Sequence, residues 1–190
     1  MNIYIIGVGG QGIGLLSEVI LRAIDHAGIK VAGVDTHGLA QRGGIVVSQV
    51  RYGEDIYSPL IGKAEADIVI ALERNEAYRA MNNMLKDGGT LIYYNALWQP
   101  LEVRVAQSQE VSEDVLNTQC QKRGIKVFKV FNKELKNAQM QNTVLLGNMS
   151  RNSLIPEVEN DHYIKAMEDL MEGTMLEKNR DLFIRESKSV

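Results

Sequence analysis

The sequence is poor in cysteine and histidine, and both shortages exclude classes of function. The chain has 190 residues with one cysteine, Cys120, and three histidines. A single thiolate cannot hold an iron–sulfur cluster or a structural zinc site, and it cannot form an internal disulfide. The histidines His26, His37 and His162 show no i, i+4 spacing, so no histidine metal site is expected. We therefore expect a protein of the reducing cytoplasm.

Long apolar runs and an excess of positive charge are also missing. No run of about eighteen apolar residues occurs, so no transmembrane helix is expected. The first residues show neither a basic start nor a cleavage site, so no secretory signal is expected. The net charge is −3 and the pI is about 5.7. Because affinity for phosphate backbones comes from clustered positive charge, neither a nucleic acid nor a membrane is expected as a partner.

The sequence does contain the pattern of an α/β protein. An apolar run over 2–6 leads through a glycine-rich segment into an expected helix over 13–27, and a second strand is expected over 30–36. This order predicts a βαβ opening with parallel strands. We therefore expect one domain, residues 1–190, with a Rossmann-like three-layer α/β/α fold and a mainly parallel sheet. Residues 1–150 would form its core and 151–190 a helical C-terminal extension.

Further elements are expected along the chain. Alternating residues predict a strand over 45–52, and an apolar run predicts a strand over 66–72 that is covered on both faces. Ser112 is a suitable N-cap for a helix that ends near Arg123. The remaining expected elements are helices over 74–85, 135–149 and 161–175, and strands over 90–94, 103–106 and 126–131. The charged tail after residue 176 is expected to extend the last helix or to fray.

The first candidate site is the segment Gly7-Val8-Gly9-Gly10-Gln11-Gly12, which fits the pattern G-x-G-x-x-G between a strand and a helix. Glycines let the backbone turn tightly and let a ligand approach its amides, and a helix N-terminus favours negative charge. The segment predicts a nucleotide or pyrophosphate site, with Asp35 near the place of a ribose-binding acid. The alternative is a tight turn with no ligand.

The second candidate is the polar segment His37-Gly38-Leu39-Ala40-Gln41-Arg42-Gly43-Gly44, which follows the second expected strand. Loops at the carboxyl ends of adjacent parallel strands meet at one edge, so this segment is expected near Gly9–Gly12. Arg42 offers a fork of donors for a carboxylate or phosphate, and His37 can titrate near neutrality. The alternative is an ordinary loop whose polar side chains bond to the protein itself.

Four other features have simpler interpretations. Asn95 follows the expected strand over 90–94, where an asparagine often fixes a loop. Asn142 with Thr143 lies in an expected helix and is suited to capping between two helices or between a helix and a loop. Cys120 is interpreted as a helix side chain, because no neighbouring histidine supports a nucleophile. The methionines are interpreted as filler of the core or of an interface.

Taken together, these segments resemble the gamma domain of 2-oxoacid:ferredoxin oxidoreductases. The resemblance covers roughly residues 1–150, and the segment 37–44 is most similar to the beta subunit of the indolepyruvate enzymes. It is carried by Gly7–Gly12 and Gln41-Arg42-Gly43-Gly44, then by Ala66–Glu73 with Glu76 and Arg79, by Asn95, and by Asn142–Gly147.

The resemblance implies an activity for a complex rather than for this chain alone. Such enzymes decarboxylate a 2-oxoacid on thiamine diphosphate, form an acyl-CoA and pass electrons through iron–sulfur clusters to ferredoxin. This chain lacks cluster cysteines and the Gly-Asp-Gly signature of thiamine diphosphate and magnesium sites. The resemblance thus implies a non-catalytic subunit, with thiamine diphosphate, magnesium and the clusters on partner subunits and ferredoxin contacted indirectly.

The same resemblance assigns roles to residues. It implies that the glycine segment, the segment with Arg42, and Asn95 form the cofactor-binding side of the chain, facing the partner subunits and helping to enclose coenzyme A. The partner that binds thiamine diphosphate is expected to recognise most of the 2-oxoacid. An isolated chain could form a homodimer, because an apolar surface meant for a partner would otherwise be exposed.

Two alternatives stay open at this point. One is a stand-alone Rossmann-like dinucleotide-binding protein that uses Gly7–Gly12 and Asp35, although such proteins do not require the segment 37–44. The other is an interaction module in which the glycine turn has only a structural role. Tight binding of NAD by the isolated chain would support the first alternative, and neighbouring genes for a thiamine-dependent partner would support the oxidoreductase.

Overall fold

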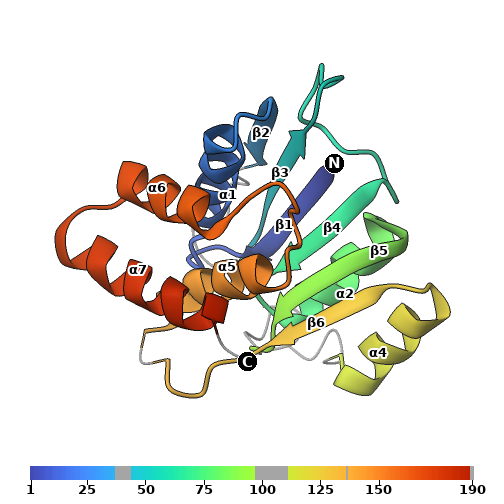
Figure 1. Cartoon of the computed structure of the whole chain (residues 1–190). Helices are drawn as coiled ribbons and strands as arrows, with labels where there is room; N and C mark the ends of the chain where they lie inside the picture. The colour runs from blue at the N-terminus through green and yellow to red at the C-terminus, as the bar shows by residue number, and fades with distance from the viewer. Residues whose placement is uncertain (37–43, 97–110, 136, 189–190) are drawn as a thin grey trace.

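The computed structural model describes residues 1–36, 44–96, 111–135 and 137–188. These residues form a six-stranded sheet in the order β2-β3-β1-β4-β5-β6, with helices on both faces (Figure 1). The strands are β1 (Asn2–Val8), β2 (Val31–Thr36), β3 (Ile45–Tyr52), β4 (Ala66–Ala71), β5 (Leu85–Tyr94) and β6 (Lys126–Val130). Neighbouring strands β1, β4, β5 and β6 run parallel. The predicted fold class, α/β with a mainly parallel sheet, is confirmed.

The helices are divided between the two faces. One face carries α1 (Ile13–His26), α5 (Gln141–Arg151), α6 (Asn160–Leu170) and α7 (Gly173–Lys188), and the other carries α2 (Arg74–Asn83) and α4 (Glu113–Lys122). β4 is covered on both faces as predicted, because Ile68 and Ile70 join the first core cluster and Val69 joins the second. In the described ranges, no helix has both the length and the apolar character needed to cross a membrane.

The predicted βαβ opening is correct in that β1 and β2 run in the same direction, but it is wrong in placing them next to each other. β3 lies between β1 and β2 and is antiparallel to both, with Ser48 opposite Ile5 on one side and Asp35 on the other. β1 and β2 are therefore parallel but do not touch. The alternation predicted for β3 is confirmed, since Ser48, Val50 and Tyr52 are buried. Inside the sheet, its backbone groups find hydrogen-bond partners along both edges.

The predicted helix over 161–175 is wrong, because the chain turns between two shorter helices. α6 ends at Leu170, Met171 has an extended backbone, and Gly173 has a φ of +53°. This left-handed conformation is accessible to glycine at little cost. α7 then continues to Lys188, so the tail forms a helix of its own instead of extending α6 or fraying.

Three other boundaries differ from the predictions. β5 begins at Leu85 and so includes Asp87-Gly88-Gly89, which was expected to end a helix. The expected helix over 135–149 is instead a short 3-10 turn, η1 (Ala138–Met140), followed by α5. The expected strand over 103–106 lies outside the described residues.

The two helices after residue 150, α6 and α7, pack on α1 and α5 at one face of the sheet. Tyr163 of α6 and Phe183 of α7 are fully buried with ring centroids 5.5 Å apart, and they belong to the same core cluster as Ile5 and Ile92. Burial of two aromatic rings is a large stabilising contribution. α6 and α7 therefore belong to the apolar core that α1 and α5 form with this face of the sheet.

Candidate functional site

The glycine segment forms a closed turn locked by its own glutamine. The backbone N–H of Val8 donates to Gln11 Oε1 at 2.7 Å, and the N–H of Gln11 donates to the Val8 carbonyl at 3.1 Å. A Cβ added at Gly7 would lie 2.7 Å from the same Gln11 oxygen, so position 7 has no room for a side chain. Gln11 is buried and shapes the turn from inside, while Gly10, with a φ of +98°, faces open space.

The end of the second candidate segment lies against this turn. The N–H of Gly9 donates to the Gly44 carbonyl at 2.8 Å, because Ile45 at the start of β3 pairs with Val8 at the end of β1. The predicted proximity is therefore confirmed at Gly44, but it results from antiparallel pairing rather than from adjacent parallel strands. His37, Gln41, Arg42 and Gly43 lie outside the described residues.

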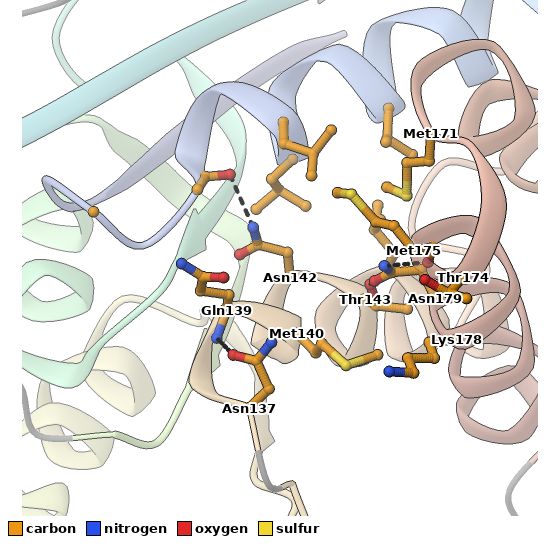
Figure 2. A pocket seen from close by; sticks show the side chains of 16 residues that line it. Asn137, Gln139, Met140, Asn142, Thr143, Met171, Thr174, Met175, Lys178 and Asn179 are labelled. Carbon is orange, nitrogen blue, oxygen red and sulfur yellow. Dashed lines mark hydrogen bonds between the residues drawn. The ribbon is translucent and has the colours of Figure 1, made fainter.

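A hydrogen bond from Asn142 connects the glycine turn to α5, which lies much later in the sequence. Its Nδ2 donates to the Gly12 carbonyl at 2.8 Å, as Figure 2 shows, and its side chain lies at the start of α5. Gly12 has a φ of +77°, and α1 begins after it without a side-chain cap. The interpretation of Asn142 as a capping residue between helices or between a helix and a loop is confirmed. The sequence placed Asn142 inside a helix expected over 135–149, so neither its position at the start of α5 nor its partner was predicted.

Alanine at position 12 is expected to destabilise the chain more than alanine at position 10. Gly12→Ala introduces strain at positive φ and places a Cβ 2.6 Å from Asn142 Nδ2, whereas Gly10→Ala introduces strain alone. Strain costs about 1–2 kcal/mol and a lost hydrogen bond about 1 kcal/mol. Urea denaturation should therefore show an additional loss of about 1 kcal/mol for Gly12→Ala. Equal losses for the two variants would contradict the Asn142 contact.

A pocket of about 360 Å³ opens beside Asn142 (Figure 2). Its walls come from the glycine turn and first turns of α1, from η1 and the start of α5, and from the start of α7 with Met171 before it. Asn142, Thr143 and Asn179 bring amide and hydroxyl groups to it, and Thr143 donates to Asn179 at 2.5 Å. The carboxyl end of β1 therefore has a concave, mixed polar and apolar surface next to it.

Asn95 lies at the same sheet edge but in a different cluster. It follows β5, which β4 separates from β1. Its Nδ2 donates to Glu113 Oε1 at 2.8 Å, and its backbone N–H donates to the Val130 carbonyl at 2.7 Å. Hydrogen bonds from Lys129 and from Asn95 lower the pKa of Glu113. Asn95 thus anchors the ends of β5 and β6 to the first turn of α4, and it does not line the pocket beside Gly12.

Glu73 is a buried acid at this edge to which sequence reasoning assigned no role. It follows β4 and caps α2, accepting the N–H of Asn75 at 3.1 Å and that of Glu76 at 2.5 Å. Its side chain is fully buried, and burial raises its pKa to about 7, assisted by the nearby charge of Glu76. The signal in the sequence was an acid placed directly between an apolar strand and a helix.

The described residues do not provide ligands for the iron–sulfur clusters or the magnesium ion of the oxidoreductases that the sequence resembles. Within the described ranges, no three His, Cys, Asp or Glu side chains form a group that could hold a metal ion. Cys120 is buried in α4 against Met81, and burial raises the pKa of its thiol to about 11. A thiol of this kind is inert, as expected for a structural cysteine.

Comparison with known proteins identifies the family. The model of the family described as pyruvate ferredoxin/flavodoxin oxidoreductase matches residues 2–185. The chain belongs to this family. The indolepyruvate oxidoreductase subunit IorB of Methanothermobacter thermautotrophicus is 30% identical over 185 residues, which are 96% of this chain and 93% of that protein. The predicted resemblance to 2-oxoacid oxidoreductases is confirmed.

A second relative is more similar over a shorter segment. Subunit IorB of Archaeoglobus fulgidus is 46% identical over 95 residues, which are 50% of this chain and 46% of that protein. The match therefore spans about half the length of this relative.

Solved structures of the family share the fold. The gamma subunit of a keto/oxoacid ferredoxin oxidoreductase from Geobacter sulfurreducens has a TM-score of 0.68 at 20% identity, covering 98% of this chain and 96% of that one. The 2-oxoglutarate:ferredoxin oxidoreductase of Magnetococcus marinus, with coenzyme A and succinyl-CoA bound, has a TM-score of 0.71 at 21% identity. The aligned region covers all of this chain and 31% of the Magnetococcus marinus chain.

Proposed function

We propose that this chain is a non-catalytic, gamma-type subunit of a thiamine diphosphate-dependent 2-oxoacid:ferredoxin oxidoreductase. The complex converts a 2-oxoacid, coenzyme A and two oxidised ferredoxins into an acyl-CoA, carbon dioxide, two reduced ferredoxins and a proton. The observation that carries the proposal is the family match over residues 2–185. The names of the IorB relatives support an aryl-2-oxoacid such as indolepyruvate as the substrate class.

The scarcity of cofactor ligands in this chain supports the placement of the cofactors on other subunits. The chain has one cysteine, which is buried, and the described ranges hold no group of metal ligands. We therefore assign thiamine diphosphate, magnesium and the iron–sulfur clusters to partner subunits in the cytoplasm. This chain contributes subunit contacts and no chemical step.

The glycine turn is the part of this chain that we assign to the partner side and to coenzyme A. Gly10 is open to solvent, and the uncapped N-terminus of α1 favours an anionic group such as a phosphate. Gly44 brings the end of the segment that contains His37, Gln41 and Arg42 to the same place. Asn95 follows β5, which is two strands away from β1 in the sheet. Its hydrogen bond to Glu113 holds the loop after β5 at the same edge of the sheet.

The stand-alone dinucleotide-binding alternative is not favoured by the strand order. In a dinucleotide fold, the ribose-binding acid follows a strand adjacent to the one that leads into the glycine loop. Here β3 separates β1 from β2, which carries Asp35. The side chain of Asp35 instead lies near the first turn of α1, 3.5 Å from the place of a Cβ on Gly14.

A pull-down from the native host tests the proposal. The full chain, tagged and expressed in anaerobically grown cells, should bring down a large partner with several cysteines in equal amount, as measured by mass spectrometry. The purified assembly should contain thiamine diphosphate and iron and should reduce ferredoxin with a 2-oxoacid and coenzyme A. The isolated chain serves as the control and should show no activity. Recovery of the chain alone, together with NAD binding in a titration, would favour the dinucleotide alternative.

A further inference from the structure

The outer edge of β2 presents backbone groups that no neighbouring strand uses. β2 is the last strand on its side of the sheet, next to β3 (Figure 1). The N–H of Gly53 donates to the carbonyl of Lys30 at 3.0 Å, so the backbone groups of Lys30 point toward β3. Because this direction alternates along a strand, the N–H and C=O groups of Val31, Gly33 and Asp35 point away from β3. Among the described residues, no further strand meets them.

The opposite edge of the same sheet is protected against an added strand, whereas β2 is not. The edge strand β6 has 5 residues and carries the exposed side chains of Lys126 and Lys129. Lysines, prolines and bulges on an edge strand hinder pairing with another chain. The sequence of β2, Val-Ala-Gly-Val-Asp-Thr, contains no lysine or proline, and its pairing with β3 continues without a register shift. The edge formed by β2 is therefore open to pairing.

The sequence of β2 is complementary to a second copy of itself. In an antiparallel pair of two β2 strands, the outward-pointing residues must face each other. The register that pairs all of 31–35 places Gly33 opposite Gly33, and Val31 opposite Asp35 of the second copy. Asp35 of one copy then lies beside the end of the strand where Lys30 of the other copy precedes Val31. Opposite charges meet at both ends of the pair, and no like charges face each other, so charge complementarity favours a second copy as the occupant.

Leu21 of α1 provides an apolar contact at the centre of the same edge. A Cβ added at Gly33 would lie 2.6 Å from Leu21 Cδ1, so the leucine side chain lies directly over this glycine. Gly33 is exposed and Leu21 is only half-buried. In the symmetric register Gly33 lies on the two-fold axis, so the Leu21 side chains of the two copies meet across that axis. Pairing of the strands therefore also buries apolar surface that a single copy leaves in contact with water.

We propose that two copies of this chain associate through their β2 strands, which pair antiparallel about a two-fold axis at Gly33 and join the two sheets into one. Backbone hydrogen bonds over 31–35 give the contact its direction, and the two Leu21 side chains pack beside them. Such a contact is isologous, because the same residues of both copies form it. The proposal does not rest on the proposed function, since its test needs neither partner subunits nor enzyme activity.

A proline at the outer edge of β2 tests the backbone pairing. Sedimentation equilibrium of the full chain at about 100 µM should give twice the monomer mass of 21.2 kDa. Val31→Pro removes an N–H that points away from β3, at the first residue of an edge strand, where proline is tolerated. It should weaken the dimer at least about tenfold. Val31→Ala keeps the N–H and should keep the dimer. A monomeric unmodified chain, or equal dimerisation of the proline and alanine variants, overturns the proposal.

Cross-linking by engineered cysteines tests the register and does not depend on the folding of the proline variant. In the proposed register, Ala32 lies opposite Val34 of the second copy in a pair without hydrogen bonds, whose Cα atoms are about 4.5 Å apart, within reach of a disulfide. The double variant Ala32→Cys/Val34→Cys should form a covalent dimer under mild oxidation, seen on a non-reducing gel. Each single variant is a control and should run as a monomer, because its cysteine faces an unmodified residue. Cys120 is buried and does not contribute. No covalent dimer of the double variant, or equal cross-linking of a single variant, overturns the proposal.

Discussion

Replacing Gly147 with alanine is expected to reduce the free energy of unfolding by about 3 kcal/mol, the upper end of the cost of overpacking a core. Gly147 lies in the middle of α5 where α7 crosses it. An added Cβ would overlap the Cβ of Glu186 and lie 3.2 Å from the carbonyl oxygen of Phe183. The backbones of the two helices approach each other at this point, so one methyl group must push the helices apart.

Neither helix is free to move. Asn132 and Asn148 both donate to the carboxylate of Glu186, at 2.6 and 3.3 Å, and the ring of Phe183 is buried against Tyr163. α5 is held at its other end by the bond from Asn142 to Gly12. The cost of the added methyl is therefore not relieved by a small shift of α7.

The matched control is Gly14→Ala, at another helical glycine, in the first turn of α1. A Cβ there meets Asp35 Oδ2 at 3.5 Å, which is an ordinary contact. Alanine is a better helix former than glycine by up to about 1 kcal/mol, so this variant should be neutral or slightly stabilising. Chemical denaturation of both variants would separate the crowding effect from helix propensity. A neutral Gly147→Ala would show that the helices do not cross as closely as described.

The second large effect is a loss of stability with rising pH that depends on Glu73. Its folded-state pKa is about 7, above the ordinary value of 4.5, because burial disfavours the carboxylate. The folded chain thus binds a proton more tightly than the unfolded chain. The resulting stabilisation is complete below pH 4.5 and is lost as the pH rises through 7. Between pH 5 and pH 8 the loss amounts to about 2.5 kcal/mol.

Glu73→Gln isolates this contribution. The amide oxygen can still accept an N–H at the start of α2, but it does not titrate. The difference in unfolding free energy between Glu73→Gln and the unmodified chain should therefore shift in favour of the variant by about 2.5 kcal/mol from pH 5 to pH 8. Urea denaturation at both pH values measures it. Glu18→Gln, at an exposed site of α1, is the matched control for the same substitution outside the core, and a flat difference for Glu73→Gln would contradict the raised pKa of Glu73.

Local patterns in the sequence predicted most elements of the fold. The alternation of side chains between the two faces predicted β3 with its observed bounds. Ser112 caps α4 as predicted, by accepting the N–H of Val115 at 3.3 Å. Helix periodicity was misleading at 161–175, because an apolar stripe continues on both sides of Gly173. A glycine in the left-handed conformation can redirect the chain without interrupting that pattern.

The site was predictable only in part. The turn at Gly7–Gly12 follows from its glycines and its place between a strand and a helix. The proximity of the glycine turn to the segment that ends at Gly44 was expected, but for a different reason, because the pairing of β3 with β1 could not be inferred from either segment alone. The pocket joins residues from both ends of the chain, so no single motif describes it.

The sequence by itself determined most of the segments that form strands and helices, where the glycine turn lies, and that one thiol cannot supply a cluster. These properties depend on side-chain period, backbone freedom and composition, all of which act over a few residues. The tertiary structure decided the strand order, the bond from Asn142 to Gly12 and the raised pKa of Glu73. Each of these depends on burial and on partners brought together from distant positions, because desolvation and hydrogen bonding act through space.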